Sequence, residues 1–329
     1  EKRKMLNPKK KRTGCYLAGI LAAAAAISLL SGCGGGTPSL EEALKKTASY
    51  EQTSIPSPAS DSLGGEWTVI ALARSGKAAE DGYYEKYRAN LEKRVKEQEG
   101  VLSENRYTEY ARAVLACKAI GIDPSDIGGY DLGKPLDDFE AVTAQGLNGA
   151  VYALLALNAD RLEIDGELEQ KYLTYIVQQE KPSGGFSLDD SSDTADVDLT
   201  AMTLQCLEPY ATEEEISAII DRGVEFLADA QAEDGGYEAY GDKSSESISQ
   251  VILALSTYGI DCNKDERFQK KEKGLYDNLM EYYKKDGSFS HLLDGDSDPM
   301  ATDQAFCAMA AYSRYLNGKT SFYDMSDTN

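Results

Sequence analysis

Six apolar segments with the same pattern recur along the chain, and more polar segments separate them. The six copies start 45, 40, 50, 48 and 54 residues apart, at Trp67, Arg112, Tyr152, Met202, Gln250 and Gln304. The residue four positions after each start is small, giving a column of Ala71, Ala116, Ala156, Cys206, Ala254 and Ala308. Positions two and five after each start are apolar in every copy. Apolar residues at this spacing indicate a helix with a buried face, so the pattern predicts six apolar helices in one register.

The segments between these copies are amphipathic and predict a second set of helices. Residues 213–231 give the clearest case, because Ile216, Ile219, Ile220 and Val224 form one apolar stripe. Ser39 and Glu42 have the spacing of a capping box at the start of the first such helix. The six expected outer helices cover residues 39–50, 83–98, 136–145, 167–179, 213–231 and 268–284.

Repeats of two helices build either an open solenoid of the HEAT type or a closed ring. The six apolar helices need cover on several sides, and six pairs is the number that closes known α/α rings. We therefore expect an all-α fold, an (α/α)6 toroid of six inner and six outer helices, over residues 39–329.

The N-terminal segment has the layout of a secretory signal. Basic residues 9–12 precede residues 16–30, which carry no charge. This apolar run is shorter than the roughly 20 residues of a membrane span, although a shortened transmembrane anchor is the alternative. It ends in residues 30–33, Leu-Ser-Gly-Cys, which resemble the bacterial lipoprotein cleavage box. The resemblance implies a signal peptide at 1–32, a lipidated Cys33, a tether at 33–38, and an extracytoplasmic protein anchored to the membrane through its lipid.

Charge narrows the range of partners. Removing residues 1–32 takes away seven Lys/Arg and one Glu, which moves the net charge from −22 to −28. Such an acidic protein is not expected to bind nucleic acid or an anionic lipid surface. The four cysteines of the ring, Cys117, Cys206, Cys262 and Cys307, form no C-x-x-C pair. Neither a disulfide framework nor a structural metal is expected, and no cofactor is predicted.

One repeat carries a family resemblance. Residues 222–237 run from a base (Arg222) through an aromatic residue, Gln231 and Gly235 to Tyr237, and this order resembles the repeat of squalene and terpenoid cyclases. Weaker versions end at Phe186 and Phe289. The resemblance covers roughly residues 60–315 and implies the α/α toroid that these cyclases share with protein prenyltransferases. In that family the Gln caps helix ends and the aromatic residue packs beneath it, so these motifs are structural.

A second resemblance bears on chemistry. Residues 196–201 are similar to the Asp-x-Asp-Asp-Thr-Ala run of class II terpene cyclases, in which the second Asp donates the initiating proton. Asp198 occupies that position, while Leu199 replaces the next Asp. The related prenyltransferases need zinc ligands that include a His. This chain has one His, His291, in an expected loop.

The repeat register also locates a candidate site. All inner helices run in one direction, so their N-terminal ends share one rim. That rim is acidic, with Asp189, Asp190, Asp193, Asp196, Asp198, Glu246, Asp298 and Asp303. Asp198 and Glu246 hold equivalent positions in adjacent repeats, and neighbouring helices would place them ~5–9 Å apart, a separation suited to a glycosidic bond. Alternatively, such acids cap helices.

We interpret the chain as a cell-surface lipoprotein that binds an unknown small molecule, lipid or glycan at the acidic rim or in the lumen. The predicted ligand-binding residues are Trp67, Tyr152, Asp193, Asp196, Gln250, Asp303 and Gln304. One alternative is an enzyme, either a cyclase-like lyase or isomerase with Asp198 as proton donor or a glycan-acting enzyme with Asp198 and Glu246. A third alternative is an interaction module with a filled lumen.

Overall fold

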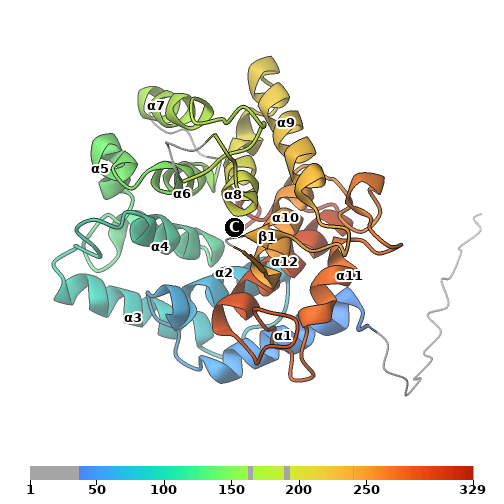
Figure 1. Cartoon of the computed structure of the whole chain (residues 1–329). Helices are drawn as coiled ribbons and strands as arrows, with labels where there is room; N and C mark the ends of the chain where they lie inside the picture. The colour runs from blue at the N-terminus through green and yellow to red at the C-terminus, as the bar shows by residue number, and fades with distance from the viewer. Residues whose placement is uncertain (1–36, 162–165, 189–192, 240, 329) are drawn as a thin grey trace, which may run out of the picture. The chain divides into compact units, whose positions relative to one another are not determined.

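The computed structural model describes residues 37–161, 166–188, 193–239 and 241–328 (Figure 1). The expected signal peptide, Cys33 and most of the tether therefore lie outside the described residues. Within the described ranges, no helix combines the length and the apolar character that crossing a bilayer demands.

Six inner helices form a closed ring, as the repeat predicted. They are α2 (Trp67–Ser75), α4 (Thr108–Ala119), α6 (Leu147–Asn158), α8 (Val197–Leu207), α10 (Ser245–Thr257) and α12 (Pro299–Leu316). Each inner helix packs against the next one along the chain, and α12 packs against α2 (Figure 1). The contact between α12 and α2 closes the circle, so the toroid is confirmed and the open solenoid is excluded.

Six outer helices alternate with the inner ones. They are α1 (Leu40–Ser54), α3 (Tyr83–Glu97), α5 (Phe139–Thr143), α7 (Gly166–Val177), α9 (Glu214–Ala230) and α11 (Leu275–Leu279). The predicted capping box is present at α1, where the Ser39 backbone N–H donates to the Glu42 carboxylate at 3.0 Å. The apolar stripe of α9 is buried, including Ile216, Ile219 and Val224.

Two outer helices are shorter than predicted. In place of a helix over 268–284, the backbone turns at Lys271 (φ 52°) and Glu272 (φ 64°), and only then does α11 begin. These left-handed residues cannot continue an α-helix, so the prediction was wrong for the first half of that segment. The expected helix over 136–145 is also divided, since Asp138 interrupts it and caps the short α5 by accepting a hydrogen bond from Ala141 N–H at 3.1 Å.

Short elements fill the connections. A π-helix η1 (Ser62–Glu66) leads into α2, and 3-10 helices lie at η2 (Pro124–Asp126), η3 (Lys134–Asp137), η4 (Glu208–Tyr210), η5 (Glu266–Phe268) and η6 (Met280–Tyr282). Strands β1 (Glu238–Ala239) and β2 (Asp242–Lys243) pair antiparallel before α10. The family-like Gln231 lies just before this hairpin, where its side-chain amide donates to the carbonyls of Gly235 and Phe268 at 3.0 and 3.2 Å. Gln231 therefore has the structural role that the resemblance implied.

The small-residue column is buried. Each of its six members is at most 1 % exposed, and none is among the described residues that line the cavity formed by α2, α6, α10 and α12. Small side chains at these positions allow the inner helices to approach closely, which a larger side chain would prevent.

A C-terminal segment, residues 318–328, crosses the C-terminal ends of the inner helices. Arg74 at the end of α2 donates to the carbonyls of Phe322, Ser321 and Asp324 at 2.9, 3.0 and 2.6 Å. The backbone N–H of Met325 donates to Ala159 just beyond α6 at 2.6 Å. Phe322, Tyr323 and Met325 are buried. This end of the ring is therefore covered, a feature that the repeat pattern did not predict.

Candidate functional site

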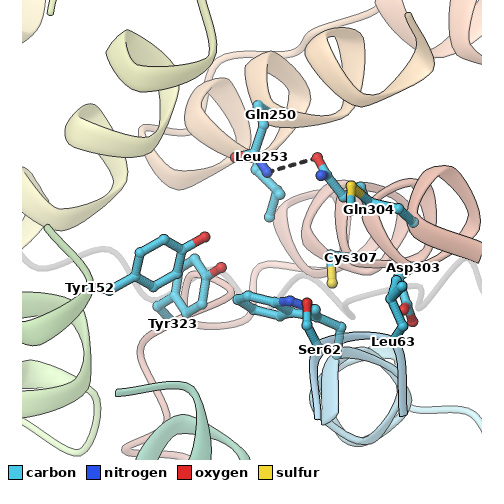
Figure 2. Close-up of a pocket in the computed structure, with 11 residues that line it drawn as sticks. Ser62, Leu63, Tyr152, Gln250, Leu253, Asp303, Gln304, Cys307 and Tyr323 are labelled. Carbon is cyan, nitrogen blue, oxygen red and sulfur yellow. Dashed lines mark hydrogen bonds between the residues drawn. The ribbon is translucent and has the colours of Figure 1, made fainter. Parts of the chain in front are cut away.

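A cavity of about 90 Å³ lies among α2, α6, α10 and α12, on the side of the ring away from the covered end. Its lining combines aromatic, amide, apolar and acidic side chains: Ser62, Leu63, Trp67, Tyr152, Gln250, Leu253, Met300, Asp303, Gln304, Cys307 and Tyr323 (Figure 2). Leu63 and Met300 are 52 % and 47 % exposed, so the cavity opens to solvent beside them. Tyr323 reaches the cavity from the C-terminal segment.

Aromatic rings form one part of the wall. The centroids of Trp67 and Tyr152 lie 6.0 Å apart with an interplanar angle of 57°. Figure 2 shows Tyr323 beside Tyr152. Burial raises the pKa of Tyr152 and holds that of Tyr323 well above its usual range, so both phenols are neutral at ordinary pH. This wall offers apolar ring faces without a formal charge.

Three glutamines form a hydrogen-bonded chain, and two of them, Gln250 and Gln304, line the cavity. The Gln205 amide donates to Gln250 Oε1 at 3.1 Å. The Gln250 amide donates to Gln304 Oε1 at 3.0 Å (Figure 2). Each bond fixes which end of the next amide is the acceptor. Gln250 and Gln304 are half-buried at the cavity, so the chain presents oriented amide groups to a ligand.

Behind the cavity, two carboxyl groups meet at one hydroxyl. The Thr68 Oγ1 atom on α2 lies 3.1 Å from Glu51 Oε2 on α1 and 2.9 Å from Asp303 Oδ1 on α12. Glu51 and Asp303 are each 2 % exposed, and we call them the acid pair. A hydroxyl has one proton to donate, so both contacts are full two-centre hydrogen bonds only when one of the carboxyl groups carries a proton. Full hydrogen bonds at both contacts therefore require at least one proton on the acid pair.

The electrostatics of the acid pair agree with this requirement. Burial and the negative charge of Asp303 together raise the pKa of Glu51 to about 8, and a hydrogen bond from Thr68 opposes the shift. Burial raises the pKa of Asp303 to about 7, and its hydrogen bond with Thr68 opposes the shift. Removing a carboxylate from water disfavours its charged form, and a neighbouring negative charge adds to that effect.

A second buried acid, Glu66, forms an ion pair with Arg112. Glu66 is fully buried, which raises its pKa, and the opposing effect comes from Arg112. Arg112 Nε donates to Glu66 Oε2 at 2.5 Å, and the Tyr87 hydroxyl donates to Glu66 Oε1 at 2.9 Å. The ion pair neutralises Arg112, the first residue of the second repeat copy, and these contacts join α4 to η1 and α3.

The predicted catalytic residues lie apart from this cavity. Asp198 and Glu246 are not among its lining residues. Burial raises the pKa of Asp198 to about 6. The charges of Asp196 and Glu246 contribute to this shift, and a hydrogen bond from Ser247 opposes it. The Oδ1 atom of Asp198 is buried and has no hydrogen-bond partner among the described residues. Glu246 contacts His291 Nδ1 at 2.9 and 3.0 Å and raises its pKa through this hydrogen bond.

The other rim acids have varied placements. Asp196 caps α8 by accepting from Leu199 N–H at 2.7 Å, and Asp298 caps α12 by accepting from Ala301 N–H at 2.8 Å. The capping interpretation therefore holds for these two. Asp193 is exposed and, like Asp196, does not line the cavity. Asp189 and Asp190 lie outside the described residues.

Of the seven predicted ligand-binding residues, the structure brings five together in the cavity wall: Trp67, Tyr152, Gln250, Asp303 and Gln304. Their role in binding remains a prediction. Sequence reasoning missed Glu51, Thr68 and Tyr323. A signal for Glu51 was present, because it falls on the apolar face of the first outer helix with Leu44 and Ala48 at helical spacing, where a charged residue is unusual. No comparable signal marked Tyr323.

The described residues offer few side chains that could bind a metal ion together. Among the described residues, no cluster of three or more His, Cys, Asp or Glu side chains is arranged to hold a metal ion. Cys117, Cys206, Cys262 and Cys307 are free, buried thiols. Burial raises the pKa of the Cys117 thiol to about 12, so this group is inert as a thiolate nucleophile.

Comparisons with known proteins identify relatives by fold. The structure is similar to the unsaturated glucuronyl hydrolase of Bacillus sp. GL1, described as responsible for the degradation of glycosaminoglycan, with 13 % identity, a TM-score of 0.56, and coverage of 86 % of this chain and 97 % of that one. It is similar to a polysaccharide lyase (12 % identity, TM-score 0.53, 84 % and 97 % coverage). It is also similar to the type II terpene cyclase MstE from Scytonema, with 12 % identity, a TM-score of 0.52, and coverage of 84 % of this chain and 97 % of that one.

At these identities the structural likeness shows the fold alone. A comparison of the sequence with those of curated proteins found no match. The model of the prenyltransferase alpha-alpha toroid domain, however, matches residues 134–328, more than half of the chain. The chain belongs to the prenyltransferase alpha-alpha toroid family.

Proposed function

We propose that the cavity binds the end of a saccharide chain. The observation that carries this proposal is the placement of the Trp67 and Tyr152 rings in one wall with the Gln250–Gln304 amide pair. A sugar ring has apolar C–H faces and a circumference of hydroxyl groups. Aromatic faces pack against the former, and oriented amides and carboxyl groups hydrogen-bond the latter.

The size of the cavity fits one end group better than a long apolar chain. The cavity has a volume of about 90 Å³, and Tyr323 closes it on the side of the covered end. This leaves no room for the folded polyprenyl chain of a cyclase. Further sugar units would lie along the rim, where Glu246 precedes Gln250 by one turn of α10, about 6 Å along the helix axis.

The structural relatives support the choice of ligand class. Two of them, a glucuronyl hydrolase and a polysaccharide lyase, are named for saccharide chemistry and share the ring over 84–86 % of this chain. Their activities belong to those proteins. They support a saccharide over the other ligand classes that the cavity alone would admit.

A glycan-acting enzyme is the second candidate, and one observation favours it. Asp198 is a buried carboxyl group whose pKa is raised to about 6, and Glu246, which contacts His291, lies near enough to contribute to that shift. Two neighbouring carboxyl groups, one of them with a raised pKa, are the arrangement that glycosidic cleavage uses. Asp198→Asn would abolish cleavage of a bound oligosaccharide while leaving its affinity unchanged.

We further propose that Cys33 carries the lipid that holds the toroid outside the membrane. The support is the order of basic residues, apolar run and Leu-Ser-Gly-Cys in residues 9–33. Cys33→Ser would release the protein from the membrane fraction, and mass spectrometry of the native protein would detect the lipid on Cys33. A membrane-bound Cys33→Ser variant would contradict the assignment.

Calorimetric titration with neutral, acidic and amino oligosaccharides tests the binding function. We expect at least one class to bind and to raise the melting temperature. Trp67→Ala or Gln304→Ala should weaken that binding by at least about tenfold, which is about 1.4 kcal/mol. Leu316→Ala, at an exposed site near the opposite end of α12, should have no effect. The proposal fails if no class binds, or if Trp67→Ala binds as the unchanged protein does.

A further inference from the structure

We propose that the saccharide held in this cavity is an amino sugar with a free amine, whose ammonium group is received by the acid pair and the aromatic wall. The inference rests on the proposed function and names the chemical class of its ligand. It depends on three features of the cavity: the proton that the acid pair holds, the aromatic rings, and the distribution of charge around them.

The acid pair can exchange its proton for another cation. The Thr68 hydroxyl cannot form a full two-centre hydrogen bond as donor to both Glu51 at 3.1 Å and Asp303 at 2.9 Å, so in the absence of ligand we assign a compensating proton to the two buried carboxyl groups. An arriving ammonium brings the same single positive charge. When it binds beside Asp303, the carboxyl proton leaves to solvent, the ammonium keeps its own protons, and the net charge of the site is unchanged.

The aromatic wall suits a cation as well as a sugar face. Trp67, Tyr152 and Tyr323 line the same cavity as Asp303. The negative faces of aromatic rings attract ammonium groups, and this attraction increases where water is excluded. The wall and the acid pair therefore act together on one positively charged nitrogen.

The charge around the cavity favours the same ligand. Asp303 is the only carboxyl group among the described lining residues, and these residues include no Lys, Arg or His. The nearby Arg112 is neutralised by Glu66 at 2.5 Å. The chain as a whole carries 56 acidic and 34 basic residues, which draws cationic ligands toward it. An acidic sugar would be repelled, and a neutral one would leave the acid pair unchanged.

None of the other groups that face the acid pair exchanges a proton near neutral pH. The Tyr83 phenol on α3 and the Cys307 thiol on α12 feel the charges of Glu51 and Asp303, and burial raises the pKa of both groups well above neutrality. Thr68 on α2 does not titrate in this range. A proton released near neutral pH on binding therefore comes from the acid pair.

A matched pair of ligands tests the inference. Titration calorimetry at pH 5.5, where the amines of the ligand are already ammonium ions, would compare the tetramer of β-1,4-glucosamine with the tetramer of β-1,4-N-acetylglucosamine, which differs by acetylation of the amines. We expect the amine form to bind at least about tenfold more tightly. Repeating the titration in buffers of different ionisation enthalpy should show net release of up to one proton per bound amine ligand, and none for the acetylated ligand.

Variants of the acid pair complete the test. Glu51→Gln should reduce both the proton release and the preference for the amine, while Glu215→Gln, an exposed change on α9, should alter neither. Asp303→Asn provides the same test from the cavity side. Equal or tighter binding of the acetylated tetramer, or binding of the amine without proton release, would overturn the inference and leave saccharide binding intact. Binding of neither tetramer, nor of any other saccharide, would overturn both.

Discussion

Replacing Glu51 by glutamine is expected to stabilise the protein at neutral pH, although it removes a buried hydrogen-bonding side chain. Glu51 and Asp303 have pKa values raised to about 8 and about 7, whereas carboxyl groups in an unfolded chain titrate near 4. The folded protein therefore binds more protons than the unfolded chain between these limits. Stability from the protonated pair is fully present below about pH 4 and is lost as the pH rises toward 7 and 8.

The magnitude follows from the number of protons. For each additional proton that the folded state binds, the free energy of unfolding falls by about 1.4 kcal/mol when the pH rises by one unit. Glu51→Gln removes at least one such proton, because its amide cannot ionise and can still donate to Thr68 or Asp303. Relative to the unchanged protein, the variant should therefore gain about 3 kcal/mol between pH 5 and pH 7.

Urea unfolding followed by far-UV circular dichroism at pH 5, 6, 7 and 8 would measure this difference. The exposed Glu215→Gln serves as the matched control, since it makes the same chemical change without altering a buried group. Its stability should follow that of the unchanged protein at every pH. If the curves of Glu51→Gln and the unchanged protein run parallel, the acid pair does not hold a proton and the reasoning is refuted.

Two further predictions concern the covered end and the rim. Arg74→Ala should lower the free energy of unfolding by about 3 kcal/mol, because it breaks the ion pair of a buried guanidinium with Asp327 at 2.7 Å and removes its hydrogen bonds to the carbonyls of residues 321, 322 and 324. Limited proteolysis should then cut within residues 318–328, and unchanged resistance there would contradict the assignment. His291 is the only histidine of the chain, so its ring signals in an NMR titration are unambiguous. Glu246→Gln should lower its pKa toward the ordinary value, since the raised value comes first from the Glu246 hydrogen bond. An unchanged midpoint would show that this bond does not form in solution.

The repeat allowed the fold to be predicted because its register is a physical requirement of the ring. A small residue stands at the same register position of each inner helix, from Ala71 on α2 to Ala308 on α12, and each is buried. The outer helices are less constrained, since each contacts the ring through one face. There the left-handed backbone at Lys271 and Glu272 ended a helix that the amphipathic pattern had predicted.

The site was only partly predictable for a different reason. The register identified Trp67, Tyr152, Gln250 and Gln304 as neighbours because equivalent positions of a ring point the same way. It could not identify Glu51, which belongs to an outer helix and approaches Asp303 only through the packing of α1 against α12. Contacts between residues over 200 positions apart leave no local pattern in a single sequence.

The covered end of the ring also has a consequence for how the chain reaches its native state. Arg74, in the first repeat, depends on residues 320–328, and α2 lacks one of its two neighbours until α12 is in place. During synthesis, the early helices would therefore expose their apolar sides until the ribosome has released the sixth repeat. Such non-local contacts slow folding and lengthen the time during which aggregation-prone apolar surface is exposed to solvent. We would expect this protein to depend on chaperones more than a solenoid of similar length, whose repeats can fold one after another.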